Sequence, residues 1–290
     1  IGNNMKNTDN IIPLPDYVRA KKALGQNFLT DKSIALKIIE ALNLDKEDIV
    51  IEVGAGTGAI TALIAPLCKK LYAVETDKDL IKPLAAVLAK YDNVEIINKD
   101  ILKTDINGII DKECRYKTVA NLPYYITTPV ISKFVEQENP PDVMVFMMQK
   151  EVADRLCASE GSRIYGSFTI YVGYRYEPSF VVNVPPQSFI PAPEVDSTVL
   201  KFIKREKPPV VVPSEEFFFS VVRTAFSQRR KKLSNCIAAM PMFDISKNET
   251  EDILIQMGIR ADARAEALSM EQFAELSWRL YDRNTDNVNK

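Results

Sequence analysis

Short apolar runs alternate with helical patterns between residues 49 and 148, and this alternation restricts the possible folds more than any other feature of the chain. Continuous apolar runs predict strands buried on both faces of a parallel sheet, and the helical periodicity between them predicts crossover helices. The expected strands are Ile49–Val53, Leu71–Glu75, Val94–Asn98, Thr118–Asn121 and Val143–Met148. The expected helices are 31–43 with Asp31 as N-cap, Ala59–Leu67, Asp79–Ala89, and Pro129–Glu136 with proline at its first position. The sequence therefore predicts an α/β fold.

Two more strands and one ambiguous segment follow this region. Phe180–Val184 and Thr198–Ile203 are expected to close the sheet. The segment 168–176 alternates with period two, which favours a strand, although helical spacing also fits it.

A charged linker containing two prolines, Lys204–Pro209, separates this part of the chain from a helical part. One expected helix starts at Ser214, and a second covers Asp252–Met257. A third starts after Ser269, which forms a capping-box pattern with Gln272. We therefore expect a mixed α/β domain over residues 1–207 and an all-helical domain over residues 208–290.

The composition excludes several classes of chemistry. The chain has 290 residues and no histidine, which removes Ser-His and Cys-His nucleophile pairs and every metal site that contains histidine. Its 4 cysteines have no C-x-x-C spacing, so we expect no metal site and reduced thiols, as in the cytoplasm. No apolar run approaches the roughly 18 residues of a membrane span, and no signal-peptide pattern is present. We therefore expect a cytoplasmic protein without a membrane partner.

Three glycines, Gly54, Gly56 and Gly58, follow the first expected strand. Glycine allows a tight turn and a close approach of the backbone to a ligand at the carboxyl end of a parallel strand. The spacing is not that of the dinucleotide fingerprint, whose third glycine comes one residue later. It is not a phosphate loop either, because no Gly-Lys-Ser/Thr follows.

Two acids after the next strands complete a candidate nucleoside site. Glu75 can accept both hydroxyls of a ribose, and Asp100 can accept from an adenine amino group. Acids at successive strand ends suit an adenosine without phosphates, and S-adenosylmethionine is such a ligand. The alternative is that the glycines only turn the chain and the acids are solvated strand ends.

The tetrapeptide Asn121-Leu122-Pro123-Tyr124 follows the fourth expected strand and suits methylation of an adenine amine. The Asn121 side-chain oxygen and the Leu122 carbonyl, which Pro123 aims by restricting Leu122 to extended conformations, can bind the two N–H groups of this amine. Tyr124 can stack on a flipped base, worth on the order of 1–3 kcal/mol against an extrusion cost of a few kcal/mol. Because a sulfonium is a strong leaving group, the reaction needs neither metal nor general base. The alternative is an ordinary Asn-x-Pro turn.

Two further segments are candidates for binding the substrate. The rigid segment Phe189–Pro193 can place Phe189 on the opposite face of the base, although a plain proline-rich connection explains it equally well. A basic cluster without any acid consists of Arg223, Arg229, Arg230, Lys231 and Lys232. Such a cluster can bind RNA phosphates, although it can also complement the dipole of a helix end. The net charge of −2 gives no global sign of nucleic-acid binding.

At these residues the chain resembles the small-subunit ribosomal RNA adenine dimethyltransferases of the KsgA type. The similarity covers nearly the whole chain and is carried by Gly25–Leu29, the glycine motif at 52–58, Asn121–Tyr124, Gln149–Val152, Phe189–Ser197 and Phe226–Lys231. The resemblance implies a Rossmann-like S-adenosylmethionine-dependent methyltransferase sheet with a small all-α C-terminal domain. In that fold the segment 166–176 is a helix, against the period-two interpretation.

The resemblance also implies an activity and its residues. Such enzymes dimethylate N6 of two adjacent adenosines near the 3′ end of small-subunit ribosomal RNA, with a role in maturation of the subunit. The implied donor contacts are Gln26, Asn27, Leu29, Gly54, Gly56, Gly58, Glu75, Asp100 and Asn121. The implied adenine contacts are Asn121, Leu122, Pro123, Tyr124 and Phe189. The expected partner is small-subunit ribosomal RNA or its precursor particle, bound by a monomer through the basic cluster of the helical domain.

Three alternatives remain at this point. A large-subunit ribosomal RNA adenine methylase shares the donor and acceptor motifs, although the segments 189–197 and 228–231 fit the small-subunit type better. A DNA adenine methyltransferase fits less well. A non-catalytic RNA-binding assembly factor could share the fold, but intact Asn121, Tyr124 and Glu75 argue against lost catalysis.

Overall fold

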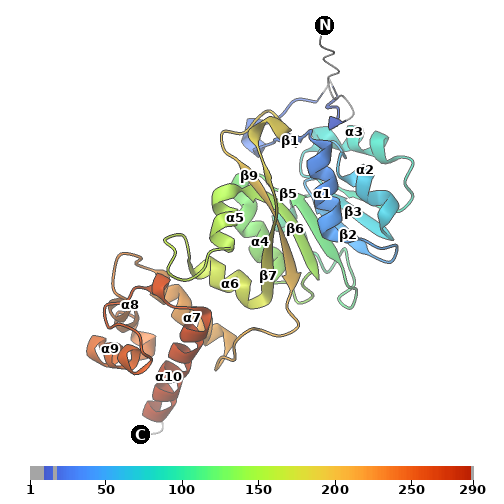
Figure 1. Cartoon of the computed structure of the whole chain (residues 1–290). Coiled ribbons are helices and arrows are strands. Elements are labelled where there is room, and N and C mark those ends of the chain that lie inside the picture. Colours follow the sequence, from blue (N-terminus) through green and yellow to red (C-terminus); the bar gives the residue numbers. More distant parts are fainter. Residues whose placement is uncertain (1–9, 16–17, 289–290) are drawn as a thin grey trace. The chain divides into compact units, whose positions relative to one another are not determined.

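The computed structural model describes residues 10–15 and 18–288, with side chains up to residue 283. The chain forms two compact units (Figure 1). The first contains the residues up to Ala153 together with Glu177–Lys204, and the second contains Asp154–Tyr176 and the residues from Arg205 onward. The expected boundary at residue 207 is close to the third crossing between the units, after Lys204. The segment 154–176, however, belongs to the second unit.

A seven-stranded sheet forms the centre of the first unit, in the order β4-β3-β2-β5-β6-β9-β7 (Figure 1). Its parallel strands are β2 (Ile49–Val53), β3 (Lys70–Val74), β4 (Val94–Ile97), β5 (Lys117–Asn121) and β6 (Val143–Gln149). The strand β9 (Ser197–Lys204) pairs antiparallel with β6, and β7 (Tyr176–Val184) lies at the edge. The predicted parallel strands and the two closing strands are therefore confirmed.

Helices cover both faces of this sheet. They are α1 (Lys32–Leu42), α2 (Thr61–Ile64) continued by η3 (Ala65–Leu67), α3 (Lys78–Leu88), α4 (Thr127–Val135) and α5 (Lys150–Leu156). Ile38 of α1 belongs to the same buried cluster as Val145 of β6. On the other face, Phe134 of α4 packs against Phe146 of β6 with ring centroids 6.0 Å apart. Because neighbouring residues of a strand point to opposite faces, Val145 and Phe146 anchor helices on opposite sides of the sheet.

The ends of two helices test the expected caps. Asp31 accepts hydrogen bonds from the N–H groups of Ser33 and Ile34 at the start of α1, which confirms it as the N-cap. Helix α4 begins at Thr127, so Pro129 is its third residue and not its first. Proline is tolerated there because the N–H groups of the first helical turn have no partner within the helix.

A two-stranded antiparallel ribbon joins the N-terminal segment to the segment before β9. It consists of β1 (Phe28–Leu29) and β8 (Phe189–Ile190), with Phe28 opposite Ile190 and Leu29 opposite Phe189. Short 3-10 turns complete the first unit: η2 (Lys22–Leu24), η4 (Ile101–Lys103), η5 (Tyr124–Ile126) and η6 (Pro186–Ser188).

The second unit is built from helices packed around an aromatic core. They are α6 (Ser167–Arg175), α7 (Glu215–Phe226), α8 (Leu233–Ala238), α9 (Lys247–Gln256) and α10 (Met270–Val288), with the 3-10 turns η7 (Pro241–Phe243) and η8 (Ala265–Ala267). Ser214 caps α7 by accepting from the N–H of Phe217. The expected capping box at α10 is confirmed, because Ser269 and Gln272 bond each other's backbone N–H through their side chains.

The expected strand at 168–176 is wrong, because residues 167–175 form the helix α6. Ile170 and Tyr174 are one helical turn apart, and both are buried in the core of the second unit. The ring of Tyr174 lies 5.3 Å from that of Phe219 on α7 in an edge-to-face contact. Alternate positions are also buried in this segment, so the sequence satisfies both periods, and packing against α7 selects the helix.

No helix within residues 10–15 and 18–288 combines the length and apolar character needed to cross a membrane.

Candidate active site

A cleft opens at the carboxyl ends of β2 and β5, where the strand order reverses. From β2 the chain continues outward to β3 and β4, whereas β5 and β6 lie on its other side. Ligands of open α/β sheets bind at such a switch point. The cleft and its open mouth together contain about 800 Å³ of space, open solvent included.

Most of the predicted site residues line this cleft. The donor residues that it contains are Gln26, Asn27, Gly54, Gly56, Glu75, Asp100 and Asn121. The acceptor residues that it contains are Asn121, Leu122, Pro123, Tyr124 and Phe189. Leu29 and Gly58 do not line it. The structure thus brings segments more than 150 residues apart into one cleft.

The glycine loop leaves space where a side chain would fill the cleft. Gly54 and Gly56 have φ angles of +73° and +57°, a left-handed conformation that favours glycine. A Cβ on Gly54 would lie 3.7 Å from the Asn121 carbonyl oxygen, between the ends of β2 and β5. The third glycine acts differently, because a Cβ on Gly58 would come within 2.9 Å of Leu84 on α3. Gly58 therefore permits close packing of the loop against a helix.

Glu75 is held by two backbone N–H groups at the end of β3. Its Oε1 accepts from Asp77 and its Oε2 from Gly56, both at 2.8 Å, and the residue is only 5% exposed. Burial raises the pKa of Glu75, while these N–H groups oppose the shift. A carboxylate has about four acceptor positions, so each oxygen keeps one for a ligand. This arrangement fits the two neighbouring hydroxyls of a ribose.

Asp100 precedes the 3-10 turn η4 and lies at the same end of the sheet. Its Oδ1 accepts from the N–H of Leu102 at 2.9 Å, and its Oδ2 lies 4.0 Å from Lys103 Nζ. The side chain is 40% exposed, so the carboxylate can accept from an amino group of a ligand in the cleft.

Asn121 and Leu122 leave the sheet in a fixed geometry. Asn121 Nδ2 donates to the carbonyl of Asn27 at 3.0 Å, which orients the amide. The Leu122 N–H donates to Met147 of β6 at 3.2 Å. Within the described part of the chain, neither the Asn121 side-chain oxygen nor the Leu122 carbonyl accepts a hydrogen bond. Two acceptors at the cleft are therefore open to a donor such as an amine.

Two aromatic side chains reach the cleft from different elements. The hydroxyl of Tyr124 lies 2.8 Å from Ser197 Oγ, a hydrogen bond that fixes the ring. Burial raises the pKa of Tyr124. Phe189 is 3% exposed, and its strand pairs with Leu29. The pairing explains how a residue far along the chain arrives beside the Asn121–Tyr124 segment.

The structure adds a buried acid that sequence reasoning did not assign. Glu52 is 3% exposed, and among the described residues its Oε2 has no hydrogen-bond partner. Burial raises the pKa of Glu52 to about 8, and the nearby charge of Glu75 adds to the shift. Glu52 and Leu29 line a smaller hollow, which contains about 410 Å³ with open solvent included and shares Gly54 and Asn121 with the main cleft. A charged residue inside the apolar strand 49–53 was the available signal.

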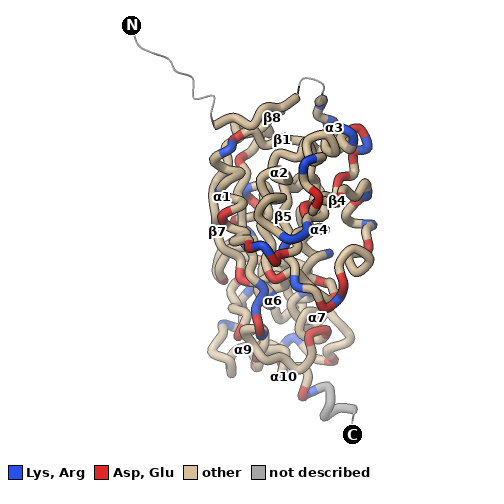
Figure 2. Tube along the Cα trace, turned by 90° about the vertical axis from the view of Figure 1, so that its right-hand side faces the viewer, with Lys and Arg blue, Asp and Glu red and all other residues tan. Residues whose placement is uncertain are grey.

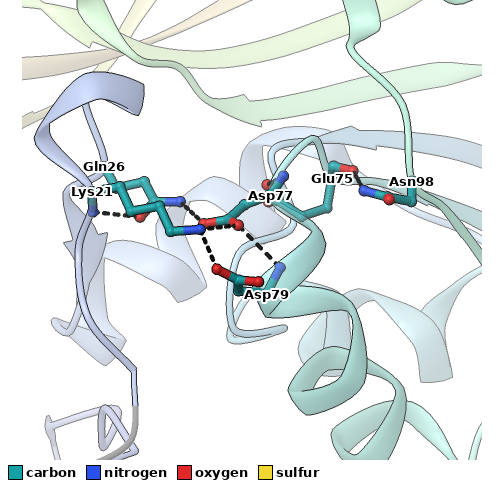
Figure 3. Close-up of polar contacts among 6 residues, drawn as sticks. All are labelled: Lys21, Gln26, Glu75, Asp77, Asp79 and Asn98. Carbon is teal, nitrogen blue, oxygen red and sulfur yellow. Dashed lines mark hydrogen bonds and ion pairs between the residues drawn. The ribbon is translucent and has the colours of Figure 1, made fainter.

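The N-terminal wall of the cleft is held by ion pairs that the sequence analysis also missed. We call residues 18–30 the strap. Lys21 Nζ lies 2.6 Å from the carboxylates of both Asp77 and Asp79, and Gln26 Nε2 donates to Asp77 at 2.9 Å (Figure 3). The predicted donor residue Gln26 thus uses its side-chain nitrogen to attach the strap to the start of α3.

The predicted basic cluster lies in the second unit. Arg223 is on α7, and the others follow this helix; all are exposed. The Arg229 guanidinium donates to the carbonyls of Arg163 at 2.6 Å and Tyr165 at 2.9 Å, so it joins two segments of the unit. Basic and acidic positions are interspersed along the chain (Figure 2), so any RNA contact depends on local clusters.

The sequence pattern of the family described as ribosomal RNA adenine dimethylase matches residues 17–280. The chain belongs to this family. It is 46% identical to ribosomal RNA small subunit methyltransferase A of Geobacillus sp. strain WCH70 over 262 residues, 89% of this chain and 90% of that protein. The protein of the same name from Anoxybacillus flavithermus is 44% identical over 266 residues, 90% of each chain.

Two solved structures share the architecture. A dimethyladenosine transferase from Plasmodium falciparum superposes with a TM-score of 0.77 at 27% identity, covering 89% of this chain and 98% of that one. The 23S rRNA methyltransferase ErmE superposes with a TM-score of 0.71 at 23% identity, covering 88% of this chain and all of that one, and it shows the fold alone. The predicted methyltransferase fold is therefore confirmed.

Proposed function

We propose that this protein transfers methyl groups from S-adenosylmethionine to N6 of adenosines in small-subunit ribosomal RNA. The observation that carries the proposal is a single cleft containing Glu75, held for a ribose, beside the open acceptors of Asn121 and Leu122. The relatives named ribosomal RNA small subunit methyltransferase A supply the substrate class.

On the donor side, the residues fit an adenosine without phosphates. Glu75 would accept from the ribose hydroxyls, Asp100 from the adenine amino group, and the backbone at Gly54 and Gly56 would approach the ligand closely. When bound, S-adenosylmethionine supplies an electrophilic methyl group on a sulfonium, which leaves as a neutral thioether.

On the acceptor side, the protein orients a weak nucleophile. The Asn121 side-chain oxygen and the Leu122 carbonyl would accept from the N–H groups of the adenine amine, so that its lone pair points at the donor methyl group. The N–C bond forms as the methyl–sulfur bond breaks, and the methylated amine then loses one proton to solvent. Tyr124 and Phe189 would hold the base by stacking. Positioning of this kind can supply roughly 7–11 kcal/mol of the barrier, which explains catalysis by a chain with no histidine.

The finer features of the proposal follow the family resemblance. We infer dimethylation of two adjacent adenosines near the 3′ end of the RNA, on the naked RNA or on a precursor particle in the cytoplasm, by a monomer. The first unit would carry donor binding and catalysis. The helical unit would contact RNA phosphates through Arg223, Arg230, Lys231 and Lys232, with Arg229 also holding its own fold.

The test is to incubate the protein with methyl-labelled donor and with small or large ribosomal subunits that lack the modification, and to map the labelled nucleotides. We expect label on N6 of adenosines of the small-subunit RNA. Label on the large-subunit RNA would favour the large-subunit alternative, and no label on either would favour a binding factor. The Asn121→Ala variant is the matched control, and it should bind donor but leave the RNA unlabelled.

A further inference from the structure

The strap, residues 18–30, forms one wall of the donor cleft although it contains little regular structure. It contributes Leu24, Gly25, Gln26, Asn27 and Phe28 to the lining. Its apolar attachment to α3 is small, because Val18 and Phe28 form a cluster with Leu80. The attachment of this wall to α3 therefore depends strongly on polar contacts.

Asp77 makes the central polar contacts of the strap. Its side chain is only 3% exposed, and its two oxygens accept from different strap residues: Oδ1 from Lys21 Nζ at 2.6 Å and Oδ2 from Gln26 Nε2 at 2.9 Å. The Gln26 Oε1 in turn accepts from the Lys21 N–H at 2.8 Å (Figure 3). Charge-assisted hydrogen bonds of this kind are stronger than neutral ones.

The same residue also touches the carboxylate assigned to the ribose. The Asp77 N–H donates to Glu75 Oε1 at 2.8 Å. Asp77 thus contacts two walls of the cleft, the strap through its side chain and Glu75 through its backbone. It caps α3 as well, by accepting from the N–H of Asp79.

We propose that Asp77 is a positioning residue for the methyl donor, which holds the strap and Glu75 together around the nucleoside. The inference rests on the proposed function, because it takes the cleft to be the donor site. Its consequence is that loss of the Asp77 charge shortens the residence of the donor.

An Asp77→Asn substitution isolates this role. Asparagine still caps a helix and keeps the shape of the side chain, but one of its two terminal atoms becomes a donor. That nitrogen would face either Lys21 Nζ or Gln26 Nε2, both of which are donors. Gln26 cannot correct the clash by turning its amide, because its oxygen already accepts from the Lys21 N–H. At least one strap contact is therefore lost.

Exchanging the amide and the carboxylate between positions 26 and 77 restores the hydrogen bonds between the strap and α3. In the double variant Asp77→Asn with Gln26→Glu, the new amide at position 77 can donate to the new carboxylate at position 26, whose other oxygen accepts from the Lys21 N–H. The negative charge beside Lys21 is kept. Asp79→Asn is the matched control, since the Asp79 side chain is 65% exposed and pairs with Lys21 without touching Gln26.

The experiment measures the affinity and dissociation rate of S-adenosylhomocysteine by calorimetry and stopped-flow mixing, and tryptic cleavage at the exposed Arg19 and Lys22 with and without this ligand. We expect Asp77→Asn to bind about ten- to a hundredfold more weakly, through faster dissociation, and to lose protection of the strap. The double variant should recover most of the affinity, and Asp79→Asn should match the wild type.

Wild-type affinity and protection in Asp77→Asn would overturn the inference and leave the proposed function intact. So would a double variant that binds no better than the single one, because the charge would then have no role in holding the strap. A wild-type protein that binds no S-adenosylhomocysteine would instead overturn the donor assignment itself.

Discussion

Replacing Glu52 by glutamine should make the protein more stable at alkaline pH and should make its free energy of unfolding less dependent on pH. Burial raises the pKa of this carboxyl from its ordinary value of 4.5 to about 8. The folded state holds the proton of Glu52 more tightly than the unfolded state. The stabilisation that comes from this tighter proton binding is therefore fully present below pH 4.5. It is lost as the pH rises through about 8.

The magnitude follows from the shift. Each pKa unit corresponds to about 1.4 kcal/mol, so the full effect is about 5 kcal/mol as an upper limit. Relative to a neutral glutamine of the same shape, the wild type should be destabilised by about 1 kcal/mol at pH 5 and about 4 kcal/mol at pH 8. The advantage of the variant over the wild type in free energy of unfolding should therefore grow by about 3 kcal/mol from pH 5 to pH 8.

The assay is urea unfolding of both proteins from pH 5 to pH 8, followed by far-UV circular dichroism. Glu47→Gln is the control, because the Glu47 side chain is 82% exposed and pairs with Lys69 at the surface. If the free energies of unfolding of Glu52→Gln and the wild type differed by the same amount at every pH in this range, the reasoning would be refuted. This result would mean that Glu52 is not an uncompensated buried acid.

Three further predictions concern binding and catalysis. Glu75→Ala should weaken donor affinity measured by calorimetry by about tenfold or more, because it removes the paired acceptors for a ribose; unaltered binding would exclude Glu75 from the site. Tyr124→Phe should keep most of kcat/KM, whereas Tyr124→Ala should lower it roughly 5- to 150-fold through loss of stacking, and equal activity of the two would contradict a stacking role. Replacing Arg230 and Lys231 by alanine should weaken RNA binding and reduce its dependence on salt concentration, as measured by filter binding in a salt series. An unchanged salt slope would assign these residues to the surface of the helical unit alone.

The parallel sheet and the main cleft were predictable because both rest on local patterns. Continuous apolar runs such as 143–148 identify buried strands, and the carboxyl ends of parallel strands lie at one edge of the sheet. The glycine loop after β2 and the Asn121–Tyr124 segment after β5 therefore had to lie near each other once the strand order was correct. Their joint lining of the cleft follows from this topology.

The contacts that hold the walls of the cleft were not predictable in this way. Lys21 and Asp77 are 56 positions apart, and no pattern in the sequence pairs one lysine with one acid among many. The periodicity of residues 168–176 favoured a strand because the buried residues of α6 satisfy both strand and helix periods, and only the family resemblance indicated the helix. The bonds of Arg229 to two carbonyls could not be predicted either, because they depend on how the helical unit packs.

The ribbon of β1 and β8 has a consequence for the order of events in a catalytic cycle. Leu29 of the strap is paired with Phe189, and Phe189 lines the main cleft together with the Asn121–Tyr124 segment. Because one ribbon carries both segments, the proposed function leads us to expect that occupancy by the cosubstrate and capture of the nucleobase are energetically linked. Linkage of this kind is reciprocal. If the bound cosubstrate changes the affinity for the nucleobase by some factor, the bound nucleobase changes the affinity for the cosubstrate by the same factor.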